Sequence, residues 1–139
     1  MVFILDEGSE FDAPISKVWA LAQTEGVHKH PSQIDSKMSM EGENVILSFG
    51  SKMPDGTVMN QKIKVTAIPP VGFLLETIGG PMTGTKLIQY YVPNGTKTGV
   101  RVVGSATSSN QMPDDMLRAA VLQGLAVAFA EDVENLKHI

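Results

Sequence analysis

Turn signals divide the middle of the chain into short segments, and their spacing limits the fold more than any other feature. Asp55-Gly56 and Asn94-Gly95 are dipeptides that suit the positive φ angles of tight hairpins. Further breaks come at Gly42, at Pro69-Pro70 and at residues 79–84. Between the breaks apolar and polar residues alternate, as in VMNQKIKVTAI at residues 58–68. Because strands joined by hairpins run in opposite directions, the sequence predicts an antiparallel sheet of about seven strands.

The chain begins with the first of these strands, at residues 2–11, where we expect Phe3, Leu5 and Phe11 to share one face. The segment DAPISKVWALAQ, residues 12–23, then predicts a short helix. In it Asp12 can accept hydrogen bonds from the first free N–H groups, and Pro14 occupies the first turn. Residues 24–36 predict a second short helix or a loop. We therefore expect two short helices after the first strand.

A long amphipathic helix is predicted from about Pro113 to the end of the chain. Its apolar residues recur at helical spacing and give one broad face that includes Leu117, Val121, Leu125 and Phe129. A second apolar stripe lies on the otherwise polar side and comprises Met116, Ala120 and Val127. Such a stripe could contact a partner protein or a second copy of the chain in a homodimer.

Composition excludes several classes of function. The 139 residues suit a single domain, residues 1–139, and 42% hydrophobic with 19% charged residues is typical of a globular protein. A net charge of −4 without a Lys/Arg run argues against nucleic-acid binding. There is no cysteine, so disulfides and thiolate metal sites are excluded. We see no signal peptide and no apolar run long enough for membrane insertion, and we expect a cytoplasmic protein.

The order of the predicted elements, together with FDAPISKVWALA at the first strand-to-helix joint, resembles the START-related helix-grip superfamily. That superfamily includes polyketide cyclase/dehydrase-like and Bet v 1-like proteins. The local signature is Ala13-Pro14 followed by Val18-Trp19. The resemblance implies an α+β helix-grip fold, in which a curved seven-stranded antiparallel sheet wraps around a long C-terminal helix.

The resemblance also implies an internal cavity between sheet and helix that takes a small hydrophobic or amphipathic molecule. Tyr90 and Tyr91 must face opposite sides of their strand, so we expect one of them, left undecided here, to reach the cavity. Candidate ligand-binding residues are Met38, Met40, Ile63, Val65, Tyr90, Tyr91, Val102, Gly104, Leu117, Val121, Leu125 and Phe129. Candidate rim residues are His28, His30 and Met82.

Three functions are compatible with this pattern. The first is binding or transport of a hydrophobic ligand, the second is a cyclase/dehydrase-like enzyme that uses the same pocket, and the third is a partner-binding module of the Hsp90-activator type. No catalytic constellation is visible in the sequence.

The motif GGPMTGTK resembles a phosphate loop, but Thr85-Lys86 reverses the required order and the segment joins two strands, so we predict no nucleotide or other cofactor. His28 and His30 lack a convincing third ligand, and we predict no metal.

Overall fold

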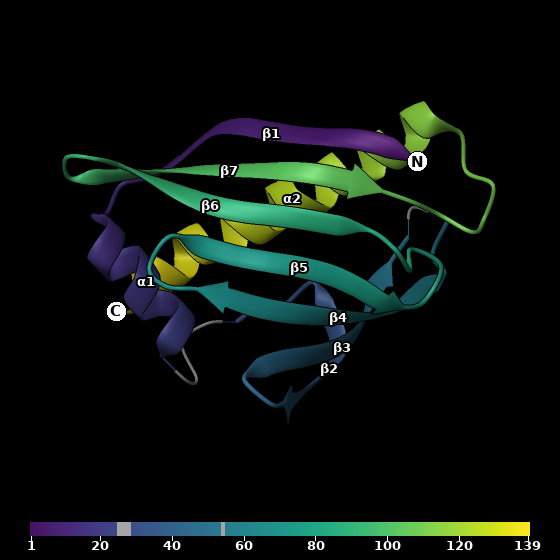
Figure 1. The fold of residues 1–139 in the computed structure, drawn as a ribbon, viewed down its shortest axis with the longest axis horizontal. Coiled ribbons are helices and arrows are strands. Elements are labelled where there is room, and N and C mark those ends of the chain that lie inside the picture. The colour runs from purple at the N-terminus through teal and green to yellow at the C-terminus, as the bar shows by residue number, and fades with distance from the viewer. Residues whose placement is uncertain (25–28, 54) are drawn as a thin grey trace.

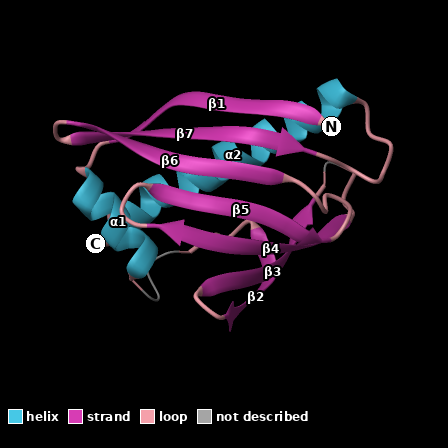
Figure 2. Ribbon diagram, viewed as in Figure 1, coloured by secondary structure: helices cyan, strands magenta, loops and turns pink. Residues whose placement is uncertain are grey.

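The computed structural model describes residues 1–24, 29–53 and 55–139 and forms one antiparallel sheet with a long helix behind it (Figure 1). The strands are ordered β1-β7-β6-β5-β4-β3-β2 across the sheet, so β1 and β2 are its edges. Figure 2 shows the long C-terminal helix behind the strands and the short helix at one end of the sheet, beside the end of the long helix. The elements are β1 (Val2–Phe11), α1 (Ile15–Gln23), β2 (Gln33–Glu41), β3 (Asn44–Lys52), β4 (Val58–Ile68), β5 (Gly72–Gly79), β6 (Lys86–Asn94), β7 (Lys97–Ala106) and α2 (Asp114–Leu136).

Hairpins between consecutive strands account for the sheet from β2 to β7, as the turn signals predict. Asn94 pairs with Lys97 across a two-residue loop, in which Gly95 has a φ of 66°. Glu41 pairs with Asn44 in the same way, with Gly42 at a φ of 63°. Because glycine has no Cβ, it adopts these angles without steric cost. The seven-stranded antiparallel sheet and the long C-terminal helix are confirmed.

The inward face of β1 differs from the predicted one. Phe3 and Leu5 are exposed, at 69% and 56%, whereas Val2 and Ile4 are buried in the core. A bulge explains why Phe11 is nevertheless buried: Ser9 lies three positions after Asp6 in β1, but their partners Val100 and Val102 lie only two positions apart in β7. The extra residue reverses the alternation of side chains along the strand. Gly8, with a φ of 100°, lies in this bulge.

The prediction of two short helices is corrected to one in the described part of the chain. Helix α1 is followed by an extended residue, Thr24, while residues 29–32 are non-helical and lead into β2. The cap also differs, because Pro14 occupies the N-cap position and no side chain caps this helix. Trp19 anchors the helix by stacking on Phe73 of β5, with ring centroids 5.2 Å apart.

Helix α2 packs on one half of the sheet, mainly against β1 and β7. Leu117 and Val121 join Ile4 and Val102 in the main core, and Leu136 belongs to a second core under α1. Phe129 stacks on Phe11, with ring centroids 4.6 Å apart. Helix α2 therefore covers β1 and β7 closely, and β3, β4 and β5 lie farther from its axis (Figure 1).

In the described residues no helix combines the length and apolar character needed to cross a bilayer.

Truncation of the buried face of α2 tests this arrangement. Leu117→Ala removes a side chain that is only 3% exposed, so we expect the free energy of unfolding to fall by about 2–5 kcal/mol. Val133→Ala on the same helix is the control; Val133 is 37% exposed, and its truncation should change stability by about 0.5 kcal/mol or less. Urea unfolding measures both, and equal midpoints for the two variants would contradict the orientation of the helix.

Candidate functional site: a cavity between the sheet and helix α2

A cavity of about 970 Å³ lies between the concave face of the sheet and α2. Its wall is predominantly apolar. Directly opposed residues of neighbouring strands point to the same face, and two such rows, Leu47–Ile63 and Val65–Leu75–Leu87, line the cavity. Helix α2 supplies the other side with Leu117, Val121, Leu125 and Ala128. The space exists because the sheet curves away from the helix beyond β6.

Many of the residues predicted to bind ligand lie in this wall. They are Ile63, Val65, Tyr91, Leu117, Val121 and Leu125, and the predicted rim residues His30 and Met82 join them. Of the two tyrosines, Tyr91 is the one that lines the cavity. Tyr90 pairs with Arg101 on the outer side of the sheet, because neighbours along a strand alternate. His28 lies outside the described residues.

Two of the predicted residues, Met38 and Met40, are not part of the cavity wall. They are 68% and 63% exposed. Met38 pairs with the wall residue Leu47, so it does point to the cavity-facing side of the sheet. However, β2 is the edge strand and extends beyond the helix, so both methionines meet solvent instead.

Three further predicted residues belong to the packed core instead of the cavity. Val102 is 2% exposed and contributes to the core between β7 and α2, and Phe129 stacks on Phe11. Gly104 allows β6 to approach closely: a Cβ at this position would lie 2.1 Å from the carbonyl oxygen of Lys86. Gly104 is therefore required for strand packing and leaves no space for a ligand.

Most of the apolar stripe that was predicted as a partner surface instead faces the cavity. Ala120 and Val127 line the cavity; Val127 is half-buried, whereas Ala120 and Met116 are exposed, Met116 at 60%. Gly124, one turn from Ala120, also faces the cavity, and a Cβ built there has no atom within 4 Å. These small residues widen the cavity on the helix side.

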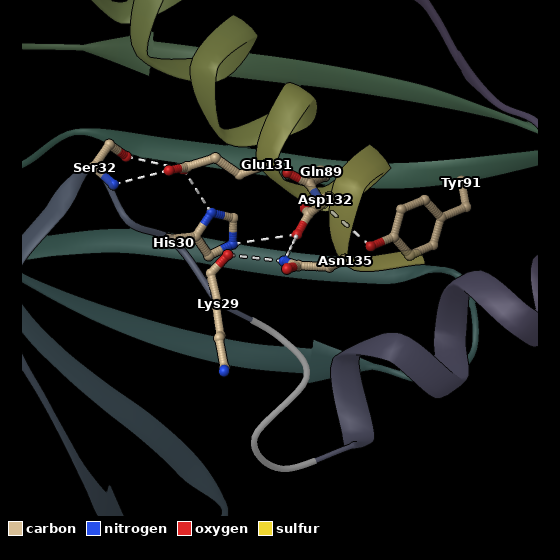
Figure 3. A network of polar contacts seen from close by, with 8 residues as sticks. All are labelled: Lys29, His30, Ser32, Gln89, Tyr91, Glu131, Asp132 and Asn135. Atoms are coloured by element: carbon tan, nitrogen blue, oxygen red, sulfur yellow. Dashed lines mark hydrogen bonds and ion pairs between the residues drawn. The ribbon is translucent and has the colours of Figure 1, made fainter. Parts of the chain in front are cut away.

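One end of the cavity carries a polar network centred on His30 (Figure 3). The Nδ1 atom of His30 lies 3.0 Å from Oε1 of Glu131, and its Nε2 atom lies 3.3 Å from Oδ1 of Asp132. Ser32 donates from its backbone N–H and its hydroxyl to Glu131, at 2.8 and 2.9 Å. Since an imidazole with a carboxylate at each nitrogen is best satisfied as a double donor, the geometry favours the charged form of His30.

The electrostatics of the network follow from burial and from these contacts. Burial lowers the pKa of His30, but the hydrogen bonds and charges of Asp132 and Glu131 together outweigh it, so the pKa is raised above 6.5. Burial alone would raise the pKa of Glu131, yet hydrogen bonds from Ser32 and His30 lower it below the ordinary value. Both shifts favour the charged forms, so the network is an ion cluster in which the histidine lies between two carboxylates.

Neighbouring contacts extend the network along α2 and into β6. Asn135 donates to the carbonyl oxygen of Lys29 at 2.8 Å and to Asp132 at 3.4 Å, which fixes the segment before β2 to the helix. Gln89 donates to the hydroxyl of Tyr91 at 3.3 Å. Burial, and secondarily the charge of Asp132, raises the pKa of Tyr91 above 10, so its phenol stays protonated. Figure 3 shows these side chains converging between α2 and β6.

Two residues of this network could have been recognised in the sequence, because each is a polar residue on an otherwise apolar face. Asp132 follows Ala128 and precedes Leu136 by one helical turn each, so it is a charged residue on the apolar face. Gln89 lies in phase with Leu87 and Tyr91 and is likewise polar on an inward face. His30, the partner of Asp132, comes from a loop about 100 positions away in the sequence. In the described part of the chain no cluster of three His, Asp or Glu residues is arranged to hold a metal ion.

Comparison with solved structures identifies the fold. The protein TTHA0849 from Thermus thermophilus superposes with a TM-score of 0.80 at 13% identity, covering 99% of this chain and 98% of that one. A START superfamily protein from Mycobacterium smegmatis gives 0.75 at 15% identity, with coverages of 96% and 98%. The Zhui aromatase/cyclase from a Streptomyces species gives 0.69 at 12%, with coverages of 98% and 94%. No family model and no curated protein sequence matches the chain. The expected likeness to helix-grip structures is confirmed at the level of the fold.

The ion cluster predicts a pH-dependent contribution to stability. Because the pKa of His30 is higher in the folded than in the unfolded chain, its contribution is full below about pH 6.5 and is lost as the pH rises through the folded value. His30→Gln should therefore lower the melting temperature more at pH 6 than at pH 9. His138→Gln, at an exposed C-terminal position, is the control and should have only a small effect on the melting temperature. An identical loss for His30→Gln at pH 6 and pH 9 would contradict the assignment.

Proposed function

We propose that this protein binds a small hydrophobic or amphipathic molecule in the cavity between the sheet and α2. The observation that carries the proposal is the cavity itself. Its volume of about 970 Å³ lies near the upper end of the roughly 300–1,000 Å³ typical of ligand pockets. Protein interiors are otherwise packed as densely as organic crystals, with few voids larger than a water molecule. An apolar ligand that fills a space of this size with apolar walls therefore stabilises the protein.

The composition of the wall supports an amphipathic ligand more than a purely apolar one. The rows Leu47–Ile63 and Val65–Leu75–Leu87 offer apolar contacts to the body of a ligand. Tyr91, Gln89 and the His30 cluster offer polar contacts at one end. The fold supports the same function by likeness, since START-type and aromatase/cyclase structures share it.

An enzyme of the cyclase type is the second candidate, and one observation favours it. The protonated phenol of Tyr91 lies in the cavity wall, within the electrostatic influence of Asp132, where it could donate a proton or hydrogen bond to a bound carbonyl group. The two functions differ in what happens to the ligand. A molecule recovered unchanged after long incubation supports a carrier, whereas conversion that is abolished by Tyr91→Phe supports an enzyme.

Filling the cavity provides a direct test of ligand binding. Gly124→Trp places a large side chain in open space on the cavity side of α2, so it should leave the fold intact. If the occupied volume costs the complex about 1.4 kcal/mol or more, the affinity for a neutral probe such as N-phenyl-1-naphthylamine falls at least tenfold. Fluorescence titration measures the affinity, and circular dichroism confirms folding.

Ala119→Trp is the matched control, because Ala119 is exposed on the same helix and lies outside the cavity wall. It should bind the probe as the unmodified protein does. Native mass spectrometry of freshly purified protein adds an independent measurement, in which a co-purified small molecule is expected. Absence of probe binding by the unmodified protein, or equal binding by the Gly124→Trp variant, would refute the cavity as the site.

A further inference from the structure

Within the ion cluster at the polar end of the cavity, the carboxylates outnumber the histidine. Two carboxylates, Glu131 and Asp132, face one imidazolium, His30, so these three side chains sum to a charge of −1 when the histidine is protonated. The three side chains are only 14%, 19% and 14% exposed, respectively. Charges that are withdrawn from water in this way act on a neighbouring ligand more strongly than charges on an open surface.

From this charge distribution we infer that the cavity prefers an amphipathic ligand whose head group is a protonated amine over one whose head group is a carboxylate. The inference rests on the proposed function and narrows it to a class of ligand. The apolar walls accept an alkyl or aryl body of either kind equally well, so the selection arises only at the polar end.

His30 cannot provide the positive site that a carboxylate ligand would need. Both of its ring nitrogens lie within 3.3 Å of a carboxylate oxygen of α2, so its charge is already neutralised by Glu131 and Asp132. A carboxylate at this end would approach two like charges, which is unfavourable. An ammonium group is instead attracted by both carboxylates.

The other polar groups of this end are compatible with an ammonium donor. An ammonium group has three donors and requires acceptors. The hydroxyl oxygen of Tyr91 and the amide oxygen of Gln89 are such acceptors, and both residues lie in the wall beside the carboxylates (Figure 3). Tyr91 and Gln89 can also hydrogen-bond to a neutral hydroxyl group. An alcohol with the same alkyl chain should therefore bind with an affinity between those of the amine and the carboxylate.

Cationic side chains near this end are more exposed than the cluster. Among the described wall residues, Lys52 is the remaining charged one, and its side chain is exposed at the end of β3. Lys29 is exposed as well, and its carbonyl oxygen, not its ammonium group, contacts Asn135. Water and salt screen these two charges more effectively than those of Glu131 and Asp132.

The test compares three ligands of equal chain length. Dodecylamine, dodecanol and dodecanoate, each below its micelle concentration, compete with N-phenyl-1-naphthylamine at pH 7 and low ionic strength. We expect the amine to bind at least about tenfold more tightly than the carboxylate, which corresponds to 1.4 kcal/mol, with the alcohol between them. Raising the salt concentration should reduce the preference.

Asp132→Asn removes one negative charge from the cluster and brings the sum over its three side chains to zero. The preference for amine over carboxylate should then fall to a few-fold at most, while binding of the neutral probe is retained. Asp114→Asn is the control, since it removes the same charge from the exposed first turn of α2 and should leave the preference unchanged. If Asp132→Asn fails to fold, Glu131→Gln makes the same change of charge at the neighbouring residue.

The outcomes separate the inference from the function on which it rests. If the probe binds but amine and carboxylate compete equally, or if the carboxylate competes better, the ligand class is overturned and the cavity function stands. A preference for the amine that persists unchanged in both cluster variants likewise overturns the role of the carboxylates. If neither the probe nor any of the three ligands binds, the proposed function is refuted together with the inference.

Discussion

The unequal packing of α2 on the sheet is the constraint on which the rest of the structure depends. Leu117 and Val121 are buried against Ile4, Val102 and their neighbours on β1 and β7, and this contact holds the helix over one half of the sheet. The curved sheet then carries β3, β4 and β5 away from the helix axis (Figure 1). A tightly packed core and a large cavity thus coexist within one layer, because a single straight helix cannot fill the whole concave face.

The sequence predicted this architecture well wherever a local rule was sufficient. Asn94-Gly95 and Gly42 give hairpins through backbone geometry alone, and the alternation in β4 places Ile63 and Val65 correctly on the inner face. Alternation failed in β1, since the bulge at Gly8 places Phe11 on the buried face although Phe3 and Leu5 are exposed. A bulge depends on pairing with a strand about 90 residues later in the chain, and a single segment does not reveal it.

The site was less predictable than the fold because it depends on contacts between distant segments. Met38 and Met40 have the correct side-chain direction, but their exposure follows from the position of β2 at the edge of the sheet. His30 was expected at the rim of the cavity. In the structure its two nitrogens are occupied by consecutive acidic residues of α2, a pairing that no sequence spacing indicates.

The same ion cluster connects the stability of the protein with the properties of its cavity. Glu131 and Asp132 hold the segment before β2 on α2 through His30, Ser32 and Asn135. Their charges also set the electrostatic potential at one end of the ligand space. Burying carboxylates costs free energy unless each is paired and hydrogen-bonded, and here the histidine and serine donors offset that cost. The carboxylates that hold this segment in place therefore also make the polar end of the cavity more favourable for a cationic head group than for an anionic one.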